Sequence, residues 1–281
     1  MPDKSDISRR VEKMGLRTIS GEAKEGFFIP YRYAGDVSAT VDEYVALAPI
    51  FQQGEGGYST WLEKADAFYD EMMTFDGGDR TGARFNQYWC PRLDAAILYT
   101  MVRSLMPERI VEIGAGHSTR FIARAISDGD GSCDVTAVDP APRKEVDALG
   151  VSFIPETLQS AGTNIFGALK EGDFLCVDSS HILMPGSDVD IIINRVLPTL
   201  PAGAIVYFHD IFLPRPYPQD WHWRGYNEQN AVGGLLQGGY EVLFASHYVV
   251  SEMTERFAQS KVSQLAILPG AHECGLWLRK R

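Results

Sequence analysis

The stretch VEIGAGHSTR, residues 111–120, decides how the rest of the chain is interpreted. Its apolar start, together with the preceding two residues, reads as a short strand, and Ser118 or Thr119 can cap a helix that follows. Between strand and helix, Gly114 and Gly116 let the backbone turn tightly and approach a ligand closely. A strand that turns through glycines into a helix indicates one unit of an α/β fold.

Similar units recur along the chain. The predicted strands that alternate with helical segments are residues 109–114, 134–139, 151–155, 173–178 and 204–210. This alternation predicts a parallel sheet, because parallel strands need a crossover connection. Two further strands, at 240–246 and 275–280, are expected to form an antiparallel edge pair. The fold class is therefore α/β: a Rossmann-like, seven-stranded, mostly parallel sheet with helices on both faces.

The first 84 residues lack this alternation. We expect them to form a mainly helical N-terminal extension that caps a substrate pocket, and residues 85–281 to form the main domain. The glycine-containing stretch FDGGDRTGARFNQ, residues 75–87, is the predicted link between them.

Composition excludes several classes of partner. The net charge is −11, and no Lys/Arg-rich run appears, so neither nucleic acid nor an anionic membrane is an expected partner. The four cysteines lack CxxC spacing, which predicts reduced thiols without a zinc site. The N-terminus is polar, and no apolar stretch approaches the roughly 20 residues that span a bilayer, so we expect a cytoplasmic protein. The oligomeric state stays open, a homo-oligomer included.

Two acids flank the glycine loop. Glu112 stands two residues before Gly114, and Asp139 ends the next predicted strand, where an acid suits the paired hydroxyls of a ribose. A dinucleotide fingerprint would need a third small residue at position 119, which is Thr119, and an acid just before the loop disfavours a pyrophosphate. Glu112 fits better beside the cationic amino-acid arm of S-adenosylmethionine, so these residues favour a methyltransferase over a dehydrogenase.

The stretch EIGAGHST, residues 112–119, resembles motif I of the class I S-adenosylmethionine-dependent methyltransferases. The resemblance covers roughly residues 85–250 and points to a bacterial branch that acts on small molecules, distantly similar to catechol O-methyltransferase. The other stretches that carry it are Asp139, VDSSH at 177–181, HDIFLPRPYP at 209–218 and YNEQNAVGGLL at 226–236. The cofactor-lining residues that it implies are Glu112, Gly114, Gly116, His117, Ser118 and Asp139. Ser118 departs from the family pattern, which often has a third glycine there.

Polar residues also end the two strands that follow. Asp178 ends one strand with His181 three residues later, and His209-Asp210 ends the next. In a doubly wound sheet these ends are neighbours at the ligand-binding edge, so we interpret the four residues as catalytic. Either histidine is a candidate general base, with the other orienting the substrate.

A divalent cation such as Mg²⁺ is the second interpretation of the same strand ends. Catechol O-methyltransferase and its relatives bind a metal through acids that Asp178 and Asp210 match, but Ile211 replaces the expected asparagine. One ligand would thus be missing.

The following segment, FLPRPYPQDWHWRGYN, is rich in proline and aromatic residues. It is either an aromatic loop over the site or one packed on the sheet edge. The predicted function is methyl transfer from S-adenosylmethionine to a small-molecule acceptor, most favourably at an oxygen. The alternatives are a non-catalytic cofactor-binding module and an NAD(P)-dependent oxidoreductase.

Overall fold

A computed structural model describes residues 4–75, 82–129, 131–142, 146 and 149–281. The contacts divide the chain into two compact units, Met1–Val41 and Asp42–Arg281. The first unit holds helix α1 (Lys4–Ser20) and the short 3₁₀ helix η1 (Ala34–Asp36). In the described part of the chain, no helix is long and apolar enough to cross a membrane.

The second unit is built on one seven-stranded sheet with the strand order β3-β2-β1-β4-β5-β7-β6. All neighbours up to β5 pair in parallel, and β7 pairs antiparallel with both β5 and β6. The strands are β1 (Arg109–Ile113), β2 (Asp134–Val138), β3 (Ser152–Ile154), β4 (Phe174–Val177), β5 (Ile205–Phe208), β6 (Tyr240–Ala245) and β7 (Leu276–Lys280). The predicted fold class is confirmed. The last two strands pair antiparallel as predicted, but β7 lies inside the sheet. Of these two strands, only β6 lies at an edge.

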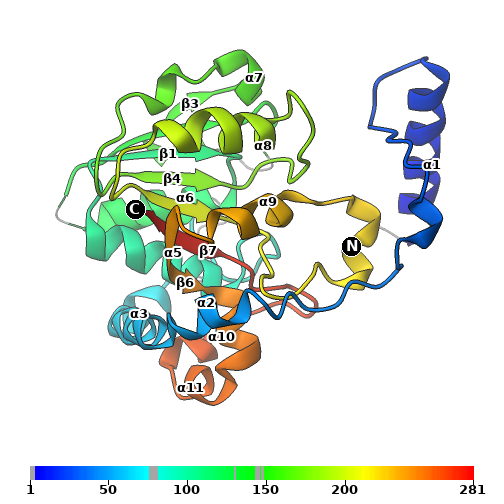
Figure 1. The fold of residues 1–281 in the computed structure, drawn as a ribbon. Coiled ribbons are helices and arrows are strands. Elements are labelled where there is room, and N and C mark those ends of the chain that lie inside the picture. Colours follow the sequence, from blue (N-terminus) through cyan, green and yellow to red (C-terminus); the bar gives the residue numbers. More distant parts are fainter. Residues whose placement is uncertain (1–3, 76–81, 130, 143–145, 147–148) are drawn as a thin grey trace. The chain divides into compact units, whose positions relative to one another are not determined.

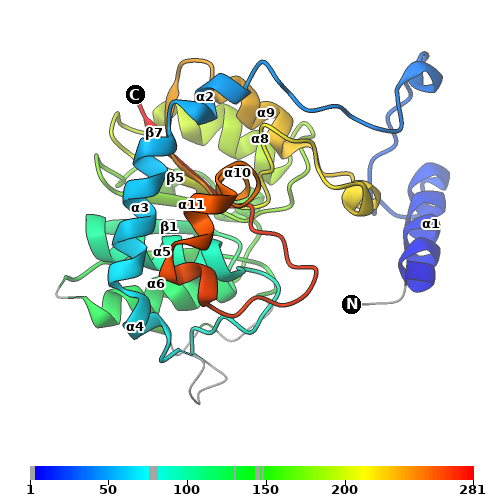
Figure 2. The same cartoon turned by 90° about the horizontal axis from the view of Figure 1, so that it is seen from below.

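Helices cover both faces of this sheet. Helices α5 and α6 lie on one side and α8 lies on the other (Figures 1 and 2). The α-helices of this unit are α2 (Ala48–Gln52), α3 (Glu55–Ala67), α4 (Tyr69–Met72), α5 (Arg92–Leu105), α6 (His117–Asp128), α7 (Leu158–Ala161), α8 (Asp188–Ile191), α9 (Glu228–Leu235), α10 (Ser246–Glu252) and α11 (Thr254–Ala258). The short 3₁₀ and π segments are η3 (Asn164–Phe166), η4 (Ile192–Val196), η5 (Leu197–Thr199), η6 (Gln219–Arg224) and η7 (Lys261–Gln264).

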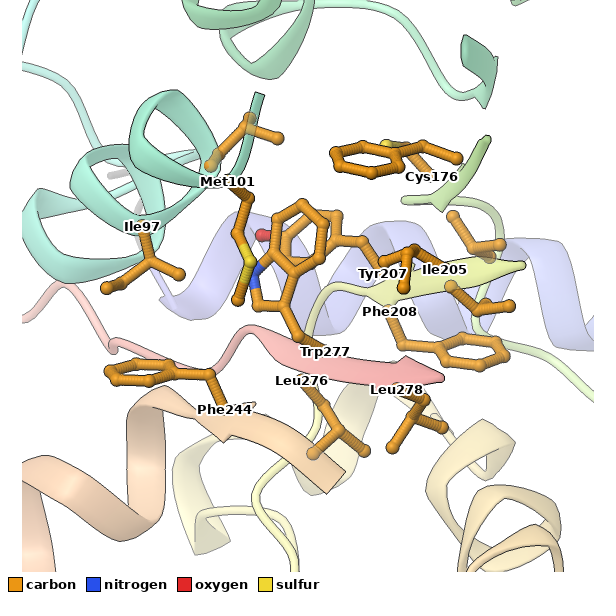
Figure 3. Packing of buried hydrophobic residues seen from close by; sticks show 14 of the residues in the cluster. Ile97, Met101, Cys176, Ile205, Tyr207, Phe208, Phe244, Leu276, Trp277 and Leu278 are labelled. Atoms are coloured by element: carbon orange, nitrogen blue, oxygen red, sulfur yellow. The ribbon is translucent and has the colours of Figure 1, made fainter. Parts of the chain in front are cut away.

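Large buried side chains meet where β7 enters the sheet. Trp277 of β7 is fully buried, and its ring centroid lies 4.7 Å from that of Tyr207 on β5 and 5.6 Å from that of Phe174 on β4. Ile97 and Met101 of α5 reach the same region (Figure 3). Burying such large aromatic and aliphatic side chains stabilises the fold by roughly 1.5–3 kcal/mol each, which fixes the strands whose ends carry the site.

Residues 42–75 contribute to this same core. Phe51 of α2 and Tyr58 and Leu62 of α3 are fully buried within its main hydrophobic cluster. Figure 2 shows the course of α3 along the unit. The contacts therefore divide the chain between residues 41 and 42. The domain boundary near residue 84 stays a prediction, and part of the predicted link, residues 76–81, lies outside the described residues.

Candidate active site

The strand order creates a switch point between β1 and β4. The chain runs from β1 outward to β3 and then returns to β4 on the other side of β1. In open α/β sheets, ligands bind beyond the carboxyl ends of the strands at this point. Gly114 follows β1, Asp139 follows β2, Asp178 follows β4 and His209 follows β5, so all four lie at this edge.

Gly114 brings the two halves of the site together. Its φ is +88°, and a Cβ at this position would lie 1.8 Å from the backbone oxygen of Asp178. Only glycine fits both this conformation and this close approach. The predicted cofactor loop and the predicted catalytic strand end are therefore in direct contact.

Glu112 is buried beneath the loop with two hydroxyl partners. Ser118 Oγ donates to Oε1 and Thr119 Oγ1 donates to Oε2, both over 2.6 Å. Burial raises the pKa of Glu112 to about 7, although these two hydrogen bonds oppose the shift. Thr119 also accepts the Gly116 N–H at 2.8 Å, so the third small residue that a dinucleotide site would need is replaced by a hydroxyl that closes the loop.

Asp139 holds the same loop from the β2 side. Its carboxylate accepts the backbone N–H of Ala115 at 2.9 Å and that of Ala141 at 2.7 Å. The residue is half-buried, and each oxygen retains a free lone pair that could accept from a ligand hydroxyl. His117 and Ser118 begin α6 and are buried, and the His117 ring stacks on Trp89 with centroids 6.4 Å apart.

The structure brings the four predicted catalytic residues into one cluster. His181 Nε2 lies 3.2 Å from Asp178 Oδ1 and 3.4 Å from Asp210 Oδ2. His209 Nδ1 lies 3.1 Å from Asp210 Oδ1 and 3.7 Å from Asp178 Oδ1. His181 and Asp210 have φ values of +59° and +58°, a left-handed conformation that is uncommon outside glycine and often found at functional sites.

Mutual attraction sets the charges of this cluster. Burial opposes ionisation of Asp178, but the facing His209 and His181 outweigh it and hold the pKa of Asp178 well below its usual value. Burial likewise disfavours the imidazolium forms, but the hydrogen bonds that His181 donates to Asp178 and Glu228 raise its pKa well above the usual value. The acidic groups around His209, Tyr207 and Asp210 first among them, do the same for the pKa of that residue. The acidic neighbours therefore favour the imidazolium forms of both histidines.

The cluster also contains three buried residues that the sequence interpretation did not include. Glu228 is fully buried, and its Oε2 lies 2.8 Å from His181 Nδ1. Asp94 of α5 is also fully buried, and its Oδ2 lies 3.4 Å from His209 Nε2. Cys274 Sγ donates to Asp210 Oδ1 at 3.3 Å.

Only Asp94 had a sequence signal, because it occupies the apolar phase of its helix, four residues before Leu98 and seven before Met101. Glu228 lies within a motif but without a local pattern, and Cys274 has no signal.

Several of these groups could also hold a metal ion. One ligand atom from each of Asp178, His209 and Asp210 lies within 4.8 Å of the others. Ile211 cannot serve as the metal ligand that the family pattern expects at its position, but His209 offers a third ligand atom beside Asp178 and Asp210. Asp94, His209 and Cys274 form a second such group, but their proximity alone does not distinguish a metal from the hydrogen bonds that they already make.

The aromatic loop meets the cluster on one side. Tyr226 packs on His181 with ring centroids 4.6 Å apart, and Trp221 packs against Phe212 at 5.1 Å. Arg215 instead pairs with Glu43 and Glu252, away from the cluster. A separate surface hollow, on α3, α10 and α11, contains none of the predicted site residues.

Residues 111–211 match a family model described as a methyltransferase domain. The match begins within β1 and ends just beyond the His209-Asp210 pair, so it includes the glycine loop and the four residues that the sequence predicts to be catalytic. This part of the chain is similar to a methyltransferase domain. The resemblance to class I S-adenosylmethionine-dependent methyltransferases is confirmed by this match together with the strand order.

Solved structures similar to this chain share little sequence with it. A putative O-methyltransferase from Klebsiella pneumoniae is 15% identical, covers 78% of this chain and 89% of its own, and has a TM-score of 0.39. The methyltransferase PaMTH1 from Podospora anserina, solved with S-adenosylhomocysteine, is 15% identical, with coverages of 91% and 99% and a TM-score of 0.40. The plantazolicin methyltransferase BamL is 12% identical, with coverages of 79% and 99% and a TM-score of 0.37. No curated protein sequence matches the chain.

Proposed function

We propose that this methyltransferase transfers the methyl group of S-adenosylmethionine to an oxygen of a small-molecule acceptor. The observation that carries the proposal is the contact of the Gly114 loop with Asp178, which joins a cofactor-type loop to a cluster of four acids and two histidines. The same observation disfavours a non-catalytic module, because a buried cluster of charges is costly to maintain without a use.

The residues that would hold the cofactor are those of the glycine loop. Asp139 would accept from the ribose hydroxyls, and Glu112 would face the cationic amino-acid arm. A cation near Glu112 favours its ionised form, which a carboxyl with a pKa of about 7 reaches readily at neutral pH. Gly116 leaves open space at the position of a Cβ, as a ligand approaching the backbone requires.

When bound, the cofactor supplies an electrophilic methyl group on a sulfonium. The protein must align the acceptor hydroxyl with that carbon and remove its proton as the O–C bond forms and the C–S bond breaks. We assign proton removal to His209, because neither of its ring nitrogens makes a hydrogen bond of good geometry. His181 is held from both sides by Glu228 and Asp178, so we assign it to orienting the acceptor.

The first test is calorimetric titration of S-adenosylhomocysteine into the purified protein. We expect micromolar binding that Asp139→Ala abolishes and that Asp134→Ala, at the exposed opposite end of β2, leaves intact. If the wild-type protein does not bind, the proposal fails. A calorimetric titration with NADH tests the oxidoreductase alternative, which requires that the protein bind this nucleotide.

The catalytic assignment is tested with labelled methyl donor against a panel of hydroxylated acceptors. Because a base acts only in its neutral form and the pKa of His209 is raised, the rate should increase as the pH rises above 6.5. His209→Asn should lower kcat by about 10²-fold or more, whereas His222→Asn, on the exposed part of η6, should not. Equal rates in both variants would remove His209 from the role of base.

A divalent cation remains a second ligand for Asp178 and Asp210. Four carboxylates face two histidines in the described cluster, so a cation would offset the remaining negative charge. Loss of methyl transfer in EDTA that Mg²⁺ restores would support the metal, and full activity in excess EDTA would exclude it.

A further inference from the structure

Arg224 is a cation without an acidic partner at the border of the catalytic cluster. Its Cζ lies 3.9 Å from the ring centroid of Trp221, 5.3 Å from that of Tyr226 and 5.7 Å from that of Trp223. No carboxylate pairs with it in the part of the chain that the structure describes, and its Nε is buried without a hydrogen-bond partner. By contrast, Arg92 and Arg103 of α5 each contact aromatic rings and also pair with a glutamate.

Aromatic stacking leaves the edge of this guanidinium available. A guanidinium that stacks on a ring covers its flat face and keeps its N–H groups in the plane, where they can bind a carboxylate or phosphate with two parallel hydrogen bonds. One recorded contact uses this edge, from Nη1 to the Tyr226 hydroxyl at 3.4 Å. The rest of the donor fork has no partner among the described residues.

The segment that carries Arg224 is fixed to the catalytic cluster. Tyr226 packs on His181 at 4.6 Å, and the Asn227 N–H donates to the backbone oxygen of His181 at 3.0 Å. Asn227 Oδ1 accepts the N–H of Leu183 at 2.6 Å, and Glu228 contacts the His181 ring. A binding group supported by such contacts is held in place before the ligand arrives, which lowers the entropic cost of binding.

The charges around Arg224 favour one orientation of the ligand. The cluster next to Tyr226 contains Asp178, Asp210 and Glu228, which repel an anion. Arg224 contacts the Tyr226 ring and pairs with none of these acids, so an anionic group would be bound at its guanidinium rather than at the cluster itself.

We propose that Arg224 and the rings of Trp221 and Tyr226 form a subsite for an anionic group, a carboxylate or a phosphate, on the methyl acceptor. This inference rests on the proposed function and makes it more specific: the acceptor has an oxyanion at one end and a methylatable hydroxyl at the other. Its flat or sugar-like portion lies along Tyr226 between the two groups.

Binding of inorganic phosphate tests the subsite without knowledge of the acceptor. Phosphate is titrated at constant ionic strength while the tryptophan fluorescence, to which Trp221 and Trp223 contribute, is followed. We expect a saturable change in the millimolar range that is at least ten-fold weaker in Arg224→Gln. Arg195→Gln removes an exposed arginine of η4 that forms no ion pair with the described residues. This variant should bind phosphate as the wild-type protein does. No saturable change in the wild-type protein, or an equal change in Arg224→Gln, would overturn the proposal.

Two further measurements separate its possible causes of failure. Arg224→Lys keeps the charge but loses the planar fork, so it should bind phosphate more weakly than the wild-type protein and more tightly than Arg224→Gln. A titration with benzoate shows whether the subsite prefers a carboxylate or a phosphate, because the probe that binds more tightly has the preferred group.

All variants should bind S-adenosylhomocysteine with unchanged affinity, which shows that they are folded. Cofactor binding without phosphate binding would contradict only the subsite proposal. Phosphate binding that depends on Arg224, without cofactor binding, would instead sink the proposed function.

Discussion

At the scale of single residues, two glycines in one loop have opposite requirements. Gly114 has a left-handed φ and approaches the Asp178 backbone, whereas Gly116 has an extended φ of 176° with open space around the position of a Cβ. A sequence motif shows both simply as glycine. Their backbone conformations show that the fold requires glycine at position 114, whereas position 116 has open space that a ligand could occupy.

Gly114→Ala should therefore unfold the protein more easily than Gly116→Ala. The methyl group at position 114 meets a backbone oxygen that cannot move without shifting β4, so we expect a loss of about 3 kcal/mol or more. Gly116→Ala should change the free energy of unfolding by less than about 1 kcal/mol and weaken binding of S-adenosylhomocysteine instead. Urea unfolding and calorimetry measure the two effects. Equal stability of the two variants would contradict the steric argument.

Glu112 should make stability depend on pH. Its pKa is about 7 in the folded protein against an ordinary 4.5, so the folded state holds this proton more tightly than the unfolded state. The resulting stabilisation is complete below pH 4.5 and disappears as the pH rises through 7. Compared with Glu112→Gln, the wild-type protein should lose about 3 kcal/mol across this interval. Urea unfolding of both proteins at a series of pH values checks this, and a constant difference would refute it.

At the scale of elements, the start of α5 is held by the segment that precedes β7. Glu273 accepts the backbone N–H of Leu93 at 2.9 Å and pairs with both Nε and Nη2 of Arg92. Asp94, one residue on, accepts the N–H groups of Cys274 and Gly275. These contacts join residues about 180 positions apart and set β7 in the sheet next to β5.

Removing Glu273 should loosen this junction. Glu273 is buried, so Glu273→Ala leaves Nε and Nη2 of Arg92 and the Leu93 N–H in the first turn of α5 without their acceptor. We expect a loss of about 3 kcal/mol in urea unfolding. Glu255→Ala, an exposed position in the first turn of α11, should change stability by less than about 0.5 kcal/mol. If the two variants behave alike, the junction does not stabilise the fold.

At the scale of the whole molecule, the core identifies which part of the chain must fold together. In the described part of the chain, the main hydrophobic cluster has its first fully buried residue at Phe51. Residues 42–75 supply several more, Tyr58 and Leu62 among them. A folding unit that began after residue 84 would lack all of them.

Truncation distinguishes the two boundaries. A chain that begins at Asp42 should unfold cooperatively with the urea midpoint of the full chain, because none of the described residues of the first unit belongs to the core clusters. A chain that begins at residue 85 loses buried side chains worth about 2–5 kcal/mol each, a sum comparable to the whole stability of a domain. It should not fold. Cooperative unfolding of the shorter chain would instead support the predicted domain at 85–281.

The sequence by itself determined the α/β class, the seven strands and the residues at their carboxyl ends. Those properties follow from local patterns: apolar runs, glycine turns and acids that end strands, such as Asp139 and Asp178. Because parallel strands end at one edge, the meeting of Asp178, His181, His209 and Asp210 could also be predicted.

Only the tertiary structure decided how these residues are paired and charged. Glu228 lies 47 positions from His181, and Asp94 lies more than 100 positions before His209, yet both contact the imidazoles directly. The position of β7 inside the sheet and the aromatic rings around Arg224 are likewise set by packing. Contacts between distant segments leave no periodic signal in the chain, because they depend on where the folded elements meet.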